Sequence, residues 1–83
     1  MLTSTSIIDT PRLRPGIHAR LARIGPGRWR VLDESGVIIG HIDARPERQG
    51  IRYLARRYHP ASRAFLERGA FWSVEDAVDC LLR

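Results

Sequence analysis

Residues 28–43 constrain the fold of this chain most, because their pattern is that of a β-hairpin. Arginine alternates with apolar residues at the start, which places Trp29 and Val31 on one side of an extended strand and the arginines on the other. Asp33-Glu34-Ser35-Gly36 follows, with an aspartate that can bond to its own backbone and a glycine that accepts a positive φ. The sequence therefore predicts two antiparallel strands joined by a tight turn.

Val37 to Asp43 is the predicted returning strand. If Asp33 lies opposite Val37, Val31 lies opposite Ile39 and Trp29 lies opposite His41 on one face. The returning strand is apolar on both faces, which is typical of a central strand with another neighbour beyond it.

Two further segments have strand character. Ile51 to Tyr58 follows the polar loop Arg45 to Gly50, and Ile17 to Ile24 alternates ahead of the turn formers Gly25-Pro26-Gly27. Together with the hairpin, they predict an antiparallel meander of three or four strands.

The last third of the chain carries helix signals. Pro60 suits the first turn of a short helix that Gly69 would end. Ser73 can cap a second helix, with Glu75 and Asp76 near the positive end of its dipole. The apolar stripe of this second helix consists of Val74, Ala77, Val78, Leu81 and Leu82. We expect a fold of the α+β class, in which the C-terminal helix packs on one face of the sheet after a short preceding helix.

Length and composition fit one small domain. The chain has 83 residues, of which 43% are hydrophobic and 28% charged. We expect residues 1–15, which lack an apolar period, to form a flexible N-terminal tail, and residues 16–83 to form the α+β domain. As an alternative, Leu2, Ile7 and Ile8 could dock as an edge strand.

Several classes of function are disfavoured. Cys80 is the single cysteine, and His18, His41 and His59 stand far apart without the ligand spacing of a metal site. We find no nucleophile elbow and no phosphate-binding glycine loop, so we expect neither an enzyme nor a cofactor. No stretch approaches the roughly 20 apolar residues that span a membrane. The chain does not open with a signal peptide either, so we expect a cytoplasmic protein.

All fourteen basic side chains are arginine. A GC-rich genome would favour arginine over lysine, but the planar fork of arginine also fits phosphate and the edge of guanine. Coding bias does not explain why fourteen cations stand against nine acids. Eleven arginines and four acids lie in residues 12–57, whereas residues 73–83 are acidic. The basic character therefore belongs to the predicted sheet.

Four arginines are candidates for a binding surface. Arg28 and Arg30 on one predicted strand, and Arg52 and Arg56 on another, each project from one side of their strand. If those sides coincide, they form a cationic surface that can contact a phosphate backbone or enter a major groove. Tyr53 could stack on a base beside them. The alternative is a solvated sheet face that nearby acids neutralise in part.

Several short motifs carry a family resemblance. They are Trp29-Arg30-Val31, the turn before Gly36 and Gly40, Tyr53-Leu54-Ala55-Arg56-Arg57, Arg63-Ala64-Phe65, and Gly69-Ala70-Phe71-Trp72-Ser73 with Glu75, Ala77 and Leu81. In these motifs the chain resembles a family of short, uncharacterised actinobacterial proteins, some of them labelled as related to mismatch repair. None of the motifs resembles the ATPase, clamp or nuclease parts of mismatch-repair enzymes.

A second resemblance is one of architecture. Three strands followed by a helix, here between Arg28 and Leu82, are similar to the arm-site DNA-binding domain of phage-type integrases and to the plant ethylene-response DNA-binding domain. Both read the major groove with the sheet face opposite the helix, so the resemblance implies the same use of the sheet here. It assigns no role to an individual residue.

These observations predict a small non-enzymatic nucleic-acid-binding module, with DNA as a better candidate ligand than RNA. We expect Trp29 and Trp72 to serve the core, with Trp72 closing its edge. The alternative function is a small protein-protein interaction or dimerisation module, or a subunit of a larger complex. Such a module would use an open sheet edge or apolar surface that the helix leaves uncovered.

Overall fold

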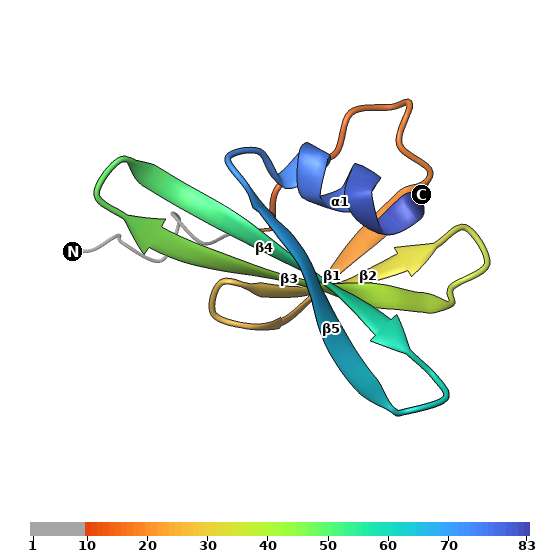
Figure 1. The fold of residues 1–83 in the computed structure, drawn as a ribbon. Coiled ribbons are helices and arrows are strands. Elements are labelled where there is room, and N and C mark those ends of the chain that lie inside the picture. The colour runs from red at the N-terminus through yellow and green to blue at the C-terminus, as the bar shows by residue number, and fades with distance from the viewer. Residues whose placement is uncertain (1–9) are drawn as a thin grey trace.

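The computed structural model describes residues 10–83, which form one antiparallel sheet followed by a helix (Figure 1). Neighbouring strands in the sheet follow chain order: β1 (Ala19–Gly25), β2 (Arg28–Asp33), β3 (Ile38–Glu47), β4 (Gly50–His59) and β5 (Ala64–Phe71). Helix α1 spans Val74–Leu82. The predicted α+β class, the antiparallel meander and the C-terminal helix are confirmed. The suggested docking of Leu2, Ile7 and Ile8 lies outside the described residues.

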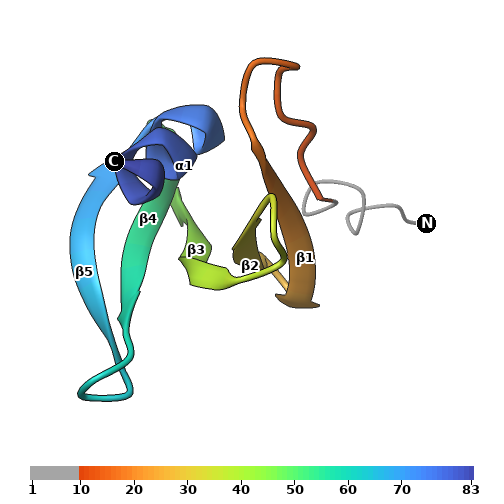
Figure 2. The same cartoon turned by 90° about the vertical axis from the view of Figure 1, so that its right-hand side faces the viewer.

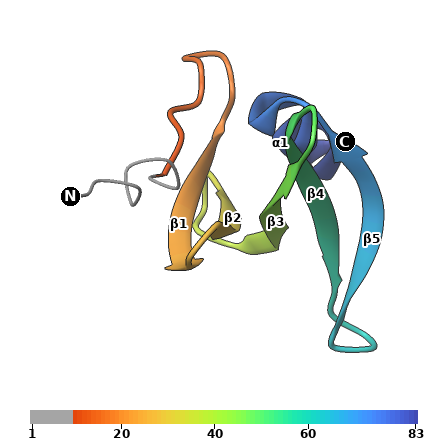
Figure 3. The ribbon, with the colours of Figure 1, turned by 90° about the vertical axis from the view of Figure 1, so that its left-hand side faces the viewer.

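The sheet is strongly curved, and α1 lies on its concave side (Figures 2 and 3). We call this side the helix face. Its buried core consists of Trp29, Val31, Ile42 and Ala55 from the sheet with Ala77, Val78 and Leu81 from the helix. Leu82, which the sequence predicts in the same stripe, is 40% exposed. Burial of one apolar face of the sheet against one stripe of the helix therefore holds the two layers together.

The turn between β2 and β3 is built as the sequence predicts. The Asp33 carboxylate accepts hydrogen bonds from the backbone N–H groups of Ser35 (2.8 Å) and Val37 (2.9 Å). Gly36 has a φ of 85°, a conformation that glycine adopts without steric cost. Strands β2 and β3 leave this turn as antiparallel neighbours, so the predicted hairpin is confirmed.

A β-bulge at Ile39 shifts the register of this hairpin by one residue. Trp29 lies opposite Ile42, so its predicted pairing with His41 is wrong, as is the pairing of Val31 with Ile39. The shift turns Ile42 into the core and His41 to the other face of the sheet. An apolar side chain is buried in place of an imidazole, which lowers the cost of desolvation.

The predicted short helix between Pro60 and Gly69 is wrong. Residues 60–63 form a turn in which Arg63 has a positive φ of 54°, and β5 begins at Ala64. Because β5 pairs with β4, the meander has five strands and not three or four. Alanine, leucine, glutamate and arginine favour a helix locally. The backbone groups along the second edge of β4 need partners, however, and pairing a whole strand outweighs local propensity.

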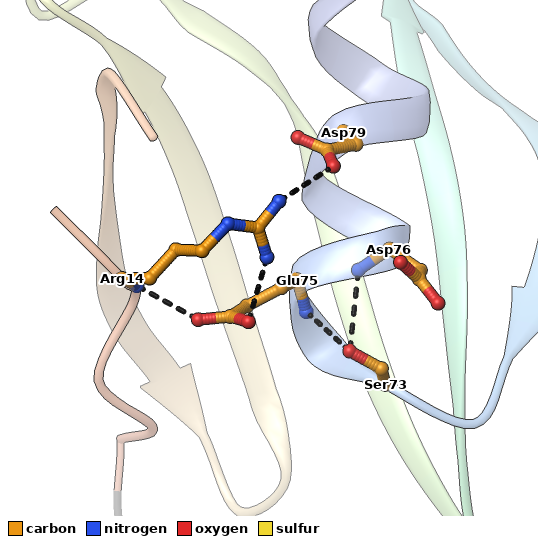
Figure 4. Close-up of polar contacts among 5 residues, drawn as sticks. All are labelled: Arg14, Ser73, Glu75, Asp76 and Asp79. Atoms are coloured by element: carbon orange, nitrogen blue, oxygen red, sulfur yellow. Dashed lines mark hydrogen bonds and ion pairs between the residues drawn. The ribbon is translucent and has the colours of Figure 1, made fainter. Parts of the chain in front are cut away.

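Helix α1 is held at its first turn and along one side (Figure 4). The Ser73 hydroxyl accepts hydrogen bonds from the backbone N–H groups of Glu75 (3.1 Å) and Asp76 (3.4 Å), as predicted for an N-cap. The Arg14 backbone N–H donates to Glu75 Oε2 at 2.7 Å. The Arg14 guanidinium donates to Glu75 Oε1 at 2.8 Å and to Asp79 Oδ2 at 3.2 Å.

Residues 10–15, which we expect in the tail, contact the domain. Leu13 packs against the core, and Thr10 Oγ1 accepts a hydrogen bond from Trp29 Nε1 at 3.2 Å. Through the Thr10 and Arg14 contacts, this segment connects β2 to the helix. The packed part of the chain therefore begins before residue 16.

Candidate nucleic-acid interface

The sheet face opposite the helix carries most of the arginines of the sheet. Residues paired across antiparallel strands project to the same face, so the register places each side chain. One row across β2 to β5 consists of Arg30, His41, Arg56 and Glu67. The adjacent row consists of Arg28, Asp43, Leu54 and Ala70. We call this surface the arginine face, and its arginines are Arg20, Arg28, Arg30, Arg45, Arg52 and Arg56.

All four arginines of the predicted surface lie on this face, and Tyr53 does not. Tyr53 projects to the helix face, where it is half-buried and packs against the core. Arg57 also projects to the helix face, and its Nη1 donates to the carbonyl oxygen of Leu81 at 2.8 Å. The surface therefore contains Arg28, Arg30, Arg52 and Arg56 without the predicted tyrosine.

The β-bulge in β3 decides this convergence. In the pairing of β3 with β4, His41 lies opposite Arg56. With the uninterrupted register, His41 would share a face with Trp29, and Arg56 would then project toward the helix. The extra residue places His41 opposite Arg30 instead, so the arginines of β2 and β4 project to the same side.

One carboxylate neutralises part of the face. Asp43 Oδ1 accepts a hydrogen bond from Arg28 Nε at 2.8 Å, and Asp43 Oδ2 lies 3.7 Å from Arg56 Nη2. The Asp43 side chain is 17% exposed, so this shared carboxylate holds two guanidinium groups side by side. Within residues 10–83, Arg30 and Arg45 take part in no ion pair. The face therefore keeps a net positive charge.

His41 stands between two of these arginines. Arg30 and Arg56 flank it on the neighbouring strands, and its ring stacks on Phe65 with centroids 3.9 Å apart and planes inclined by 17°. Burial lowers the pKa of His41, and the charge of Arg30 lowers it further, while Asp43 acts in the opposite direction. His41 is therefore largely a neutral imidazole at pH 7.

Arg52 lies against a tryptophan that the sequence predicts in the core. Its guanidinium carbon is 4.2 Å from the centre of the Trp72 ring, and its Nη1 donates to the Ala70 carbonyl oxygen at 3.4 Å. Arg52 Nε lies 3.8 Å from Glu47 Oε1, which is an ion pair but too long for a hydrogen bond. Trp72 is 50% exposed, so its predicted place in the core is wrong, whereas Phe71 does pack there.

Three buried nitrogen atoms lack a hydrogen-bond partner within the described residues, and all belong to the arginine face. They are Arg30 Nε, His41 Nε2 and Arg52 Nε. An arginine Nε is a donor, and buried donors in proteins are nearly always paired. The arginine face therefore holds hydrogen-bonding groups that the described residues do not satisfy.

A shallow cleft opens on the arginine face beside the β1–β2 turn. Its lining consists of residues 24–27, Ala44 and Pro46 together with Arg28, Asp43, Arg45 and Arg56. Three guanidinium groups against one carboxylate suit an anion, and their forked donors match the oxygens of a phosphate group.

Sequence reasoning missed three groups of this surface. The prediction places Arg45 in a loop, but β3 continues to Glu47, and the alternation from His41 onward could have shown this. Phe65 falls in the wrongly predicted helix, and Trp72 in the predicted core. Each of these errors concerns where a strand ends or on which face of the sheet a residue lies. Composition does not determine either of these features.

The described residues limit the other kinds of site. Within residues 10–83, no group of three or more His, Cys, Asp or Glu side chains could hold a metal ion. The helix of this part of the chain is too short to cross a bilayer. Comparisons with protein-family models, with curated proteins and with solved structures found no match to the chain. The surface is therefore interpreted from its own chemistry, and the family resemblance stays a prediction.

Proposed function

We propose that this protein is a small non-enzymatic nucleic-acid-binding module that contacts DNA with its arginine face. The observation that carries the proposal is that Arg28, Arg30, Arg52 and Arg56 share the sheet face opposite the helix. This is also the face that the resemblance to integrase arm-site domains assigns to DNA, and for that reason we propose DNA rather than RNA.

The chemistry of the face supports a polyanionic ligand. Its guanidinium groups outnumber its carboxylates, and the buried Nε donors of Arg30 and Arg52 lack a hydrogen-bond partner in the described residues. Phosphate oxygens accept charge-assisted hydrogen bonds from such donors. Each phosphate that is neutralised releases counterions, so the affinity should fall steeply as the salt concentration rises.

The test is a titration of labelled single-stranded and duplex DNA at low and moderate salt. Arg30→Ala should weaken binding several-fold. It should also reduce the slope of the logarithm of the affinity against the logarithm of the salt concentration by about the contribution of one phosphate contact. Arg23→Ala is the matched control, because Arg23 is exposed, lies opposite Trp29 on the helix face and carries the same charge. Circular dichroism of each variant checks the fold. Absence of binding at low salt, or equal losses in the two variants, would contradict the proposal.

The open edges of the sheet favour a second candidate, a protein-interaction or dimerisation module. Within residues 10–83, β1 and β5 each have one neighbour, and β5 carries exposed Phe65 (37%) and Leu66 (48%). Unpaired edge strands with apolar side chains can add a strand from another chain. Light scattering during the DNA titration separates the two candidates, since a tight dimer that is indifferent to DNA favours this one.

A further inference from the structure

Trp72 and Arg52 form an exposed aromatic and cationic pair at one end of the arginine face. Trp72 lies between the last residue of β5 and the N-cap of α1, and it is 50% exposed, whereas Trp29 is 2% exposed. The Arg52 guanidinium covers one side of the indole at 4.2 Å. A half-exposed indole beside a cation offers a surface on which another planar ring can stack.

The surroundings of this pair hold it in place and keep it positive. Arg52 donates to the Ala70 carbonyl oxygen, and Glu47 lies 3.8 Å from its Nε. Arg45 lies directly opposite Arg52 on β3. Like charges that face each other across two strands repel, and a phosphate between them would relieve the repulsion. The site therefore combines a stacking surface with two cations for the backbone of the same ligand.

We propose that Trp72 and Arg52 form a stacking platform for an unpaired base, so that the arginine face binds single-stranded DNA. The bases of a duplex are stacked on one another, whereas every base of a single strand can offer its ring face to an aromatic side chain. Arg45 and the shallow cleft that it lines would then contact the adjoining phosphate backbone. The inference rests on the proposed function, because it names the form of nucleic acid that the face binds.

Tryptophan fluorescence of the full chain tests this inference directly. The chain has two tryptophans, and the other one, Trp29, is buried in the core, so a ligand that stacks should quench the Trp72 emission. The probes are an oligothymidine of about 12 nucleotides, a blunt duplex of the same length and an inorganic polyphosphate. We expect quenching by the oligothymidine and salt-sensitive binding of polyphosphate without quenching.

Variants at position 72 separate stacking from charge. Trp72→Leu should weaken oligothymidine binding about tenfold and leave polyphosphate binding unchanged, because stacking of one base is lost. Trp72→Phe keeps a smaller ring and should recover part of the affinity. Trp72 is half exposed, so both variants should fold, and the emission of the buried Trp29 together with circular dichroism reports whether they do.

The outcomes distinguish this inference from the proposed function. If oligothymidine binds the wild type and Trp72→Leu equally, or saturates without quenching, the platform is wrong and the arginine face keeps its role. Tighter binding of the duplex than of the oligothymidine overturns the platform in the same way. If no nucleic acid binds at low salt, both the platform and the proposed function are overturned.

Discussion

At the scale of single residues, His41 limits the charge at the centre of the arginine face. It occupies the row between Arg30 and Arg56, where another arginine would place three cations side by side. Burial and the neighbouring arginines lower the pKa of His41, so that the imidazole is largely neutral at pH 7. Its stack on Phe65 gives the ring an apolar contact that does not depend on charge.

The lowered pKa of His41 makes the free energy of unfolding depend on pH. The unfolded chain binds the proton more tightly than the folded one, so this contribution is fully present above the ordinary pKa of 6.5 and is lost as the pH falls below it. Between about pH 7.5 and 5.5, the urea midpoint of the wild type should therefore fall more than that of His41→Phe. The variant ring can keep the stack on Phe65.

The comparison isolates His41 because the other two histidines are present in both proteins. His18 and His59 are exposed, and neither is changed in the variant. The charged groups that act on His41 are Arg30, Asp43, Arg28 and Arg56. Parallel pH profiles of the wild type and His41→Phe would contradict the prediction.

At the scale of elements, the β-bulge in β3 couples the helix face to the arginine face. It places Gly40 on the helix face beneath α1 and His41 on the opposite side. A Cβ atom at position 40 would overlap the Arg56 carbonyl oxygen and approach Leu81 Cδ1 to 3.1 Å. Glycine at this position therefore permits the close approach of the helix and of β4.

Gly40→Ala should lower the free energy of unfolding by about 1–3 kcal/mol, because the backbone of β4 has to move to admit the methyl group. Urea denaturation measures the change. Gly25→Ala is the matched control, since no other heavy atom lies within 4 Å of a Cβ at that position, and its effect should stay below about 0.5 kcal/mol. Equal unfolding free energies of the two variants would show that the sheet accommodates a side chain at Gly40.

At the scale of the whole molecule, charge is divided between the two sides of the sheet. On the helix side, Glu75 and Asp79 of α1 bind Arg14. On the other side, Asp43 pairs with two arginines of the arginine face and so lowers its positive potential. The acids of the helix therefore do not neutralise the arginine face. The acids of this face itself are Asp43, Glu47 and Glu67, and Asp43 contacts two of its arginines.

Asp43→Asn should tighten DNA binding by up to about tenfold at low salt, because it frees Arg28 and Arg56 for phosphate. The logarithm of the affinity should also fall more steeply with the logarithm of the salt concentration, and the slope should increase by about the contribution of one phosphate contact. Asp76→Asn on the exposed side of α1 changes the net charge equally and serves as the control. The same titration measures the DNA affinity of both variants. Equal gains in affinity would mean that the net charge matters and that the position of the removed carboxylate does not.

Local chemistry is what the sequence by itself determined about this protein. The turn at residues 33–36, the Ser73 cap, the helix stripe and the alternation of β2 depend on residues a few positions apart, so their patterns could be read directly. The four candidate arginines were predictable for the same reason, because their spacing along each strand is local. The number of arginines and their positive charge follow from the composition.

The tertiary structure decided what depends on distant pairing. Residues 64–71 form β5 because the open edge of β4 needed a partner, although their composition favours a helix. The arginines of β2 and β4 share a face because one extra residue, Ile39, reverses the side to which the rest of β3 projects. The predicted returning strand begins with the apolar run Val37, Ile38 and Ile39, so the start of its pattern does not say which of these side chains faces the core. Whether the arginines form one surface could therefore be settled only by the packing of the whole sheet against α1.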